Sequence, residues 1–147
     1  MRSFPTAAEI ARSNPDAMRE LGLSRPKGEY LIGLATMALD PKDHDFASIA
    51  HLNDNDAFAR LLNIRGVGRW TAEYVMLRGF GRIDIFPGDD VGGRNKLFEW
   101  FGIDGAATYD GVSAMLKRWH PYAGLIYLHL IVNAATGGAN FAQSAEG

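Results

Sequence analysis

The sequence predicts an all-α protein, a bundle of short helices without a β-sheet. Apolar residues recur three and four positions apart in several segments of the chain, which is the spacing of an amphipathic helix. Capping residues, prolines and glycines divide this pattern into segments of helical length. Apolar and polar residues do not alternate over the length of a strand, so no sheet is expected.

Local start and stop signals place the expected helices in order. Most begin at a residue whose side chain can accept hydrogen bonds from the open amides of the first turn, or beside a proline that lacks such an amide. The expected helices run from Thr6 to Ser13, from Asn14-Pro15 to Leu21-Gly22, from Lys27 to Leu39 after Ser24, from Asp45 to Leu52, from Asn53 or Asp54 to Leu62, from Trp70 to Arg78, from Asp89 or Asp90 to about Phe101, from Thr108 to Trp119, and from Pro121 to residues 137 and 138.

The last of these helices is predicted to be central and buried, because it is apolar nearly all round. Residues 139–147 are expected to form a tail. The apolar positions of this helix are Leu125, Ile126, Leu128, Leu130, Ile131 and Val132.

Length and composition limit the class of protein. A chain of 147 residues, 47% hydrophobic and 22% charged, is expected to fold as one globular domain over residues 1–138. The absence of cysteine excludes disulfides, thiolate metal sites and an iron–sulfur cluster. Because neither a signal peptide nor a span of about 18 apolar residues is found, we expect a soluble, cytoplasmic protein.

A glycine-rich turn joins two of the expected helices. Gly66 and Gly68 allow the chain to reverse within a few residues, and they leave the amides of Gly66, Gly68 and Arg69 open at the start of the second helix. Open amides and the helix dipole both favour an anion such as a phosphate there. The alternative is an ordinary helix connection whose glycines serve only geometry.

The residues around this turn resemble a known family. Residues 64–72 read IRGVGRWTA, which is similar to the helix-hairpin-helix of the DNA glycosylase superfamily named for that hairpin, its Gly-Pro-rich loop and an aspartate. Residues 86–90, FPGDD, follow where the loop and aspartate are expected. The pattern is most similar to 3-methyladenine DNA glycosylase II. Bifunctional members carry a Schiff-base lysine at the position of Trp70, so the resemblance implies a monofunctional glycosylase.

The resemblance extends from Phe4 to about Gly138 and implies base excision repair of double-stranded DNA that contains alkylated bases. In the family, further helices precede the position of Phe4, and one of them carries the wedge that fills the vacated base stack. We therefore expect a domain that lacks the first helices of the family domain. Its exposed core would then be covered by homo-oligomerisation.

Asp90 is the candidate catalytic residue. Breaking an N-glycosidic bond leaves a sugar with positive charge, which a carboxylate beside C1′ can stabilise, or that carboxylate can orient the attacking water. Asp90 matches the aspartate of the family pattern, whereas its neighbour Asp89 is a candidate helix cap. The alternative is that both residues serve only as caps.

Aromatic residues are the candidates for base recognition. Trp70 and Tyr74 lie four positions apart and therefore on one face of a helix. The resemblance implies that both line the base pocket, and it places Tyr122 at the position of a stacking tryptophan. An alkylated purine such as 3-methyladenine is cationic, and a cation–π contact contributes up to about 2 kcal/mol when desolvated. The alternative is that all three aromatics are core residues.

The hairpin is the candidate contact to the DNA backbone, through Gly66, Gly68, Arg69 and Thr71. The resemblance also implies a Na⁺ or K⁺ ion held by the main-chain carbonyls of Leu62, Ile64 and Val67, and no other cofactor is expected. The net charge of -2 is not typical of a DNA-binding domain, but basic residues gather between residues 60 and 96. A non-catalytic DNA-binding module and an inactive truncated fragment remain alternatives.

Overall fold

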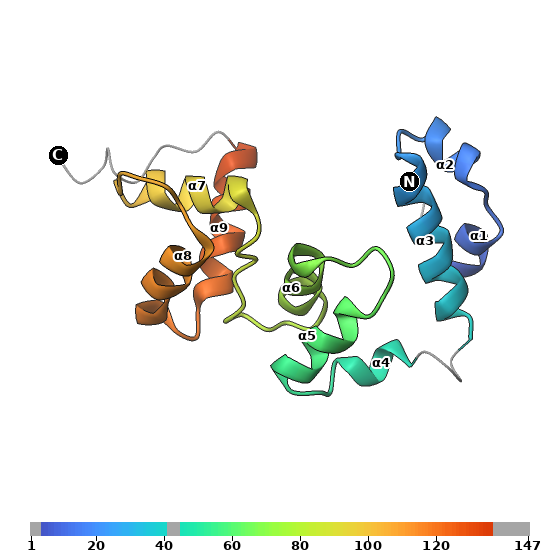
Figure 1. Ribbon diagram of the computed structural model, residues 1–147, viewed down its shortest axis with the longest axis horizontal. Coiled ribbons are helices and arrows are strands. Elements are labelled where there is room, and N and C mark those ends of the chain that lie inside the picture. Colours follow the sequence, from blue (N-terminus) through green and yellow to red (C-terminus); the bar gives the residue numbers. More distant parts are fainter. Residues whose placement is uncertain (1–3, 41–44, 137–147) are drawn as a thin grey trace. The chain divides into compact units, whose positions relative to one another are not determined.

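The computed structural model describes residues 4–40 and 45–136 (Figure 1). Within these ranges the chain forms nine α-helices, one short 3-10 helix and no strand, which confirms the predicted all-α class. The helices are α1 (Ala7–Ala11), α2 (Pro15–Glu20), α3 (Arg25–Ala38), α4 (Phe46–Ile49), α5 (Asp54–Leu62), α6 (Arg69–Gly79), α7 (Val91–Trp100), α8 (Tyr109–Leu116), the 3-10 helix η1 (Lys117–Trp119) and α9 (Ala123–Thr136).

The chain divides into two compact units, Met1–Val67 and Gly68–Gly147. In the first unit, α1 and α2 both pack against α3, and the side chains of Ile10, Met18 and Ala35 form a buried cluster between them (Figure 1). The helices α4 and α5 of the same unit also pack against each other. This unit therefore carries the first helix of the hairpin.

Side-chain caps at the helix starts follow the sequence pattern. At Thr6 both bonds of a capping box form: its hydroxyl accepts from the Glu9 amide at 3.3 Å, and the Glu9 carboxylate accepts from the Thr6 amide at 2.7 Å. The side chains of Asn14, Asp45, Asn53 and Thr108 likewise accept from an amide three positions on. The structure therefore confirms these predicted helix starts. They could be predicted because each cap involves residues close in the sequence.

Several helix boundaries differ from the expected ones. The helix α3 begins at Arg25, two residues before the predicted Lys27, and Ser24 precedes it without a side-chain cap bond. The helix α8 ends at Leu116, and the tighter η1 continues the chain to Trp119. The helix α9 begins at Ala123, after the predicted Pro121, whereas its predicted end and the tail lie outside the described residues.

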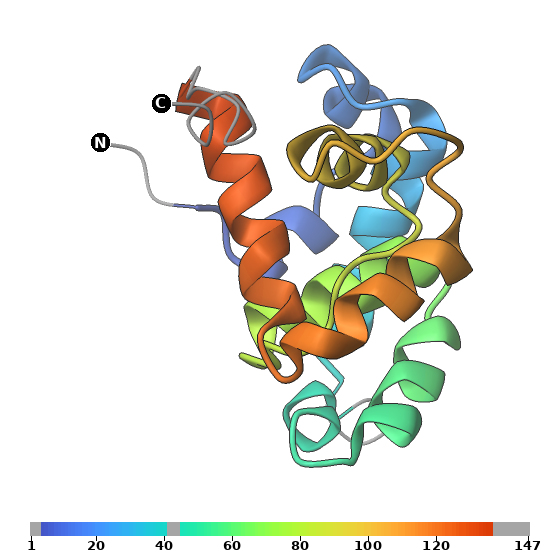
Figure 2. The same cartoon turned by 90° about the vertical axis from the view of Figure 1, so that its left-hand side faces the viewer.

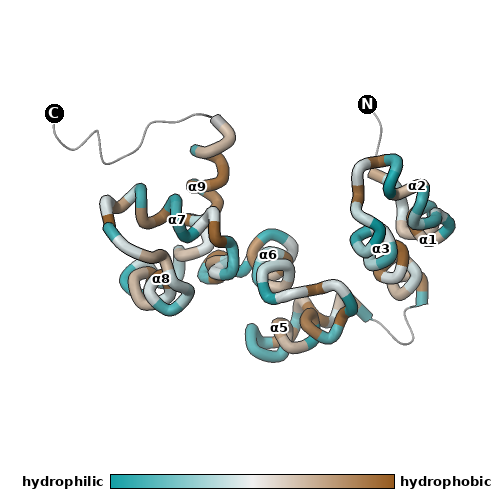
Figure 3. The backbone as a smooth tube through the Cα atoms, turned by 45° about the horizontal axis from the view of Figure 1, so that its top comes forward, coloured by the Kyte–Doolittle hydropathy of each residue, from teal (hydrophilic) through white to brown (hydrophobic). Residues whose placement is uncertain are grey.

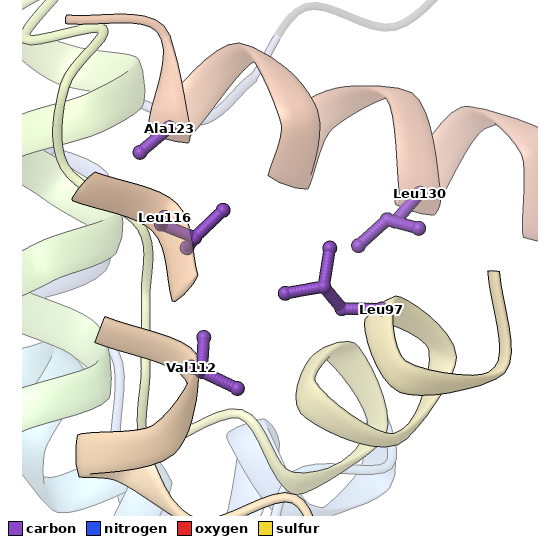
Figure 4. Packing of buried hydrophobic residues seen from close by; sticks show 5 residues of the cluster. All are labelled: Leu97, Val112, Leu116, Ala123 and Leu130. Atoms are coloured by element: carbon purple, nitrogen blue, oxygen red, sulfur yellow. The ribbon is translucent and has the colours of Figure 1, made fainter. Parts of the chain in front are cut away.

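The second unit is organised around a core formed by α7, α8 and α9. Figure 2 shows α8, in orange, leading through η1 into the long α9, in red. Figure 4 shows the side chains at the centre of this core, which point toward one another from the three helices. They are Leu97, Val112, Leu116, Ala123 and Leu130. This core fixes α7 and α9, which both carry residues of the candidate site.

The prediction that α9 is central and buried is confirmed for one side of the helix only. Ala123, Tyr127 and Leu130 form a buried stripe at positions i, i+4 and i+7, but Val132 is 59% exposed. Leu125 and Ile131 are also exposed, and Figure 3 shows that apolar residues continue along the helix. The reason is that α7 and α8 cover one side of α9 within the described chain. Homo-oligomerisation through the exposed side stays a prediction.

No helix among the described residues is long and apolar enough to cross a membrane.

Candidate active site

Asp90 begins α7 and caps it. Its Oδ1 accepts a hydrogen bond from the Gly93 amide at 3.1 Å, which satisfies one of the open amides of the first turn. Asp89 is exposed, and its Oδ2 lies 4.0 Å from Nε of Arg69. The assignment of the capping role to Asp89 is therefore wrong, and the candidate catalytic residue is itself the cap.

Tyr127 holds the other oxygen of the same carboxylate. Its hydroxyl donates to Oδ2 of Asp90 at 2.6 Å, so each carboxylate oxygen accepts from one fixed donor. Only 1% of Tyr127 is exposed. Burial, followed by the hydrogen bond to Asp90, raises the pKa of Tyr127 above its ordinary value, so the hydroxyl remains a proton donor near neutral pH.

The expected aromatic pair lies beside Tyr127. The rings of Trp70 and Tyr74 are stacked, with centroids 5.1 Å apart and planes 24° apart. The indole Nε1 of Trp70 donates to the Tyr127 hydroxyl at 3.4 Å, and the edge of Tyr127 meets Tyr74 at 6.2 Å between centroids. Trp70, Tyr74 and Asp90 are thus brought together through Tyr127.

Sequence reasoning missed Tyr127 because it lies in the apolar helix. One signal was present: a buried tyrosine needs a hydrogen-bond partner for its hydroxyl, so a tyrosine within such a helix indicates a polar group nearby. Tyr127 also lies on the buried stripe of α9.

Tyr122 has no described contact with Trp70, Tyr74, Tyr127 or Asp90. It is 55% exposed in the turn before α9, where its amide donates to the carbonyl of Trp119. Trp70 is 43% exposed. Neither Trp70 nor Tyr122 is therefore a core residue.

A second carboxylate, missed by the sequence reasoning, is buried in α6 near the loop before Asp90. Glu73 is 6% exposed, and its Oε1 accepts from the Tyr109 hydroxyl at 3.0 Å. Burial raises the pKa of Glu73, the hydrogen bond from Tyr109 and the charge of Arg69 act in the opposite direction, and the charge of Asp89 adds to the rise. Perturbed carboxylates of this kind gather at functional sites.

The loop before Asp90 is held on two sides. The Tyr109 ring packs on Gly88 so closely that a Cβ at position 88 would lie 2.4 Å from a ring carbon. The Arg94 guanidinium of α7 donates to the Gly88 carbonyl and, at 2.7 Å, to the carbonyl of Ala107. These contacts fix the backbone that leads into Asp90.

The turn of the hairpin needs its first glycine. Gly66 has φ +88°, a conformation that side-chain-bearing residues rarely adopt, and the Val67 amide closes the turn on the Ile64 carbonyl at 3.0 Å. Gly68 is the N-cap of α6 and has no side chain to satisfy the amides of the first turn. The role of these amides in binding a phosphate stays a prediction.

The carbonyls expected to hold a monovalent cation lie at the end of α5 and in this turn. The Ile64 carbonyl already accepts from the Val67 amide, and a carbonyl oxygen keeps a second lone pair for another contact. Backbone carbonyls are suitable ligands for K⁺ or Na⁺, and the cation site stays a prediction. Among the described residues no cluster of His, Asp and Glu is suited to hold a metal ion.

The fold and the site define a helix-hairpin-helix protein in which an aspartate after the hairpin lies beside an aromatic pair. Comparison with known proteins agrees. The profile of the HhH-GPD superfamily base excision DNA repair proteins matches residues 1–121. The chain therefore belongs to the HhH-GPD superfamily of base excision DNA repair proteins, which confirms the resemblance found in the sequence.

Individual relatives are about 30% identical to this chain over the aligned residues. It is 32% identical over 127 residues to the putative DNA-3-methyladenine glycosylase YfjP of Bacillus subtilis, covering 86% of this chain and 44% of that protein. It is 29% identical over 134 residues to DNA-3-methyladenine glycosylase 2 of Escherichia coli, covering 86% of this chain and 42% of that protein. The chain thus spans less than half of either relative.

A solved structure with the same fold is that of the Schizosaccharomyces pombe 3-methyladenine DNA glycosylase in complex with abasic DNA. The TM-score is 0.76 at 26% identity, and the match covers 87% of this chain and 62% of that chain.

Proposed function

We propose that the chain is a monofunctional DNA N-glycosylase that hydrolyses the N-glycosidic bond of alkylated purines such as 3-methyladenine. The observation that carries this proposal is the series of hydrogen bonds from Trp70 through Tyr127 to Asp90, which holds a carboxylate near the partly exposed Trp70. Relatives named as 3-methyladenine DNA glycosylases support the same class of substrate.

In the proposed reaction, the bond from C1′ to the base nitrogen breaks and its electron pair leaves with the base. Water adds to C1′, and the sugar carries positive charge in the transition state. Asp90 stabilises that charge, and its remaining lone pairs can accept the proton of the water. Trp70 has no amine to form a Schiff base, so water is the nucleophile and the enzyme is monofunctional.

Base recognition is proposed for the faces of Trp70 and Tyr74, with Tyr122 as a third ring. An extrahelical base stacks on aromatic side chains at about 1–3 kcal/mol per base. A cationic base gains a further cation–π attraction, which an uncharged purine lacks. This difference is the proposed source of selectivity for alkylated purines.

The proposed partner is double-stranded DNA that contains alkylated bases. The amides of Gly66, Gly68, Arg69 and Thr71 would bind a backbone phosphate, since the start of α6 favours an anion. A Na⁺ or K⁺ ion on the carbonyls of Leu62, Ile64 and Val67 would add positive charge beside that phosphate. Such contacts position the DNA without reading its sequence.

The test is the variant Asp90→Asn in an excision assay on methylated duplex DNA. Asparagine keeps the shape and the capping oxygen of aspartate, so the affinity for duplex should change little. The melting temperature should fall somewhat, because the amide nitrogen that replaces Oδ2 cannot accept from the buried Tyr127 hydroxyl. Loss of the charge should slow base release by at least about 100-fold, as loss of one electrostatic stabiliser does in other enzymes. The matched control Asp89→Asn removes the neighbouring exposed charge and should keep appreciable activity. Equal excision by wild type and Asp90→Asn would refute the catalytic assignment.

One observation favours a second candidate function, a non-catalytic helix-hairpin-helix DNA-binding module. Asp90 caps α7 through the Gly93 amide, and in such a module that would be its whole role. The same assay separates the two functions, because a module binds duplex DNA without releasing bases.

A further inference from the structure

The hairpin turn presents an arginine whose side chain is held by an aromatic ring. Arg65 is exposed, and its Cζ lies 5.6 Å from the ring centroid of Tyr30 on α3. The same ring packs against the turn itself, because a Cβ at Gly66 would lie 2.4 Å from Cγ of Tyr30. Tyr30 therefore contacts both the backbone of the turn and the charged side chain that precedes Gly66.

The next arginine along the chain is engaged with other groups. Cζ of Arg69 lies 4.8 Å from the ring centroid of Tyr109, and its Nε lies 4.0 Å from Oδ2 of Asp89. A phosphate would have to compete with the Asp89 carboxylate for this guanidinium. The charge of Arg69 is thus already partly neutralised within the second unit.

We infer that Arg65 is the side chain that binds a DNA phosphate at the hairpin, and that Tyr30 positions it for this contact. The inference rests on the proposed function, since it takes duplex DNA as the ligand. A guanidinium stacked on a ring keeps its planar N–H donors for a phosphate and has less conformational freedom to lose on binding. The amides of the turn and the Arg65 side chain would then contact the same stretch of backbone.

The test is the salt dependence of binding to a short duplex with and without a methylated base, measured by fluorescence anisotropy. Each phosphate that a protein neutralises adds about 0.9 to the slope of log affinity against log salt concentration. Arg65→Gln should lower the slope by about one and weaken binding roughly eightfold at 0.1 M salt, equally for both duplexes. Arg65→Lys keeps the charge and should keep the slope.

Arg69→Gln is the matched comparison, because it removes the same charge from a side chain that lies beside the Asp89 carboxylate. Slope loss in Arg69→Gln but not in Arg65→Gln would overturn the assignment. Tyr30→Leu should weaken binding while the slope is kept, because the charge remains but is no longer positioned. Tyr30→Phe keeps the ring face and should retain the affinity that Tyr30→Leu loses; equal affinity of Tyr30→Leu and wild type would contradict the positioning role.

The outcomes separate this inference from the proposed function. If the wild-type chain shows no salt-dependent binding to duplex DNA, the proposed function fails. If it binds with a clear salt dependence and Arg65→Gln has the wild-type slope, only the role of Arg65 fails. Melting temperatures of the variants show whether a change in affinity arises from unfolding.

Discussion

Tyr127→Phe tests whether the hydroxyl that holds Asp90 contributes to catalysis. The substitution removes one oxygen and keeps the ring, which packs edge-on against Tyr74 and Phe86. It removes the 2.6 Å bond to Oδ2 of Asp90 and the acceptor of the 3.4 Å bond from Trp70. The bond from Trp70 is long and therefore weak, so loss of the bond to Asp90 should have the larger effect.

The expected loss follows from the bond to the carboxylate. A hydrogen bond to a charged group contributes about 1.5–3 kcal/mol, and about 1.4 kcal/mol corresponds to a tenfold change in rate. The Gly93 amide still holds Oδ1 of Asp90 in the variant, so the loss should lie toward the lower end. We expect kcat to fall about 10- to 30-fold, with KM little changed because Tyr127 is buried and only its hydroxyl is lost.

Single-turnover excision from methylated duplex DNA measures this loss directly. Tyr74→Phe is the comparison, because its hydroxyl belongs to the same aromatic group but accepts from Arg78 at 2.8 Å and does not contact Asp90. The loss of rate should therefore be smaller in Tyr74→Phe. An unchanged rate in Tyr127→Phe, or an equal loss in both variants, would refute the reasoning that the Tyr127 hydroxyl positions Asp90.

Two further predictions concern the turn and the buried carboxylate. Gly66→Ala should lower the melting temperature by several degrees, because φ +88° costs an alanine about 1–2 kcal/mol and its Cβ would meet the Tyr30 ring. Gly68→Ala should keep the wild-type melting temperature, because its Cβ would meet open space. Equal melting temperatures of the two variants would contradict this. For Glu73, burial raises the pKa of the carboxyl in the folded state. The folded protein therefore binds more protons than the unfolded chain, and its stability falls as the pH rises from the ordinary pKa of 4.5 through the raised pKa. Glu73→Gln should remove this fall in stability and should be more stable than wild type at pH 7 but not at pH 4. If the melting temperatures of the variant and the wild type differ by the same amount at every pH, Glu73 does not titrate as inferred.

Local features of this fold can be predicted because they depend on residues close in sequence. The side chains of Thr6, Asn14 and Asn53 each accept from an amide three positions on, so both partners of each bond can be read from the local sequence. The reversal at Gly66 is also local, since two glycines two positions apart indicate a turn.

The exposure of α9 cannot be predicted in the same way. Its apolar pattern indicates that it can be buried on all sides, but actual burial depends on which other helices reach it. Tyr127 and Leu130 face the core, whereas Val132 is more than half exposed. An apolar pattern therefore predicts which faces of a helix favour burial, but it does not predict which of these faces another helix covers.

The missed members of the site owe their roles to contacts between distant positions. The Tyr127 hydroxyl meets Asp90 across 37 positions, and the Tyr109 hydroxyl meets Glu73 across 36. Spacing along one helix predicts that Trp70 lies beside Tyr74, and the stacked rings confirm this. The same spacing does not predict that Tyr127, on another helix, contacts both this pair and Asp90.

Capping and catalysis are compatible roles for Asp90. A carboxylate offers about four lone-pair sites, and the Gly93 amide and the Tyr127 hydroxyl occupy one on each oxygen. The first donor fixes the carboxylate to α7 and the second fixes it to α9, so two packed helices determine its position. A carboxylate held in this way needs little reorganisation when positive charge develops on a nearby sugar. The bond that makes Asp90 a cap and the bond from Tyr127 together suit the carboxylate to stabilise that charge, and a substitution that keeps the cap while removing the charge separates the two roles.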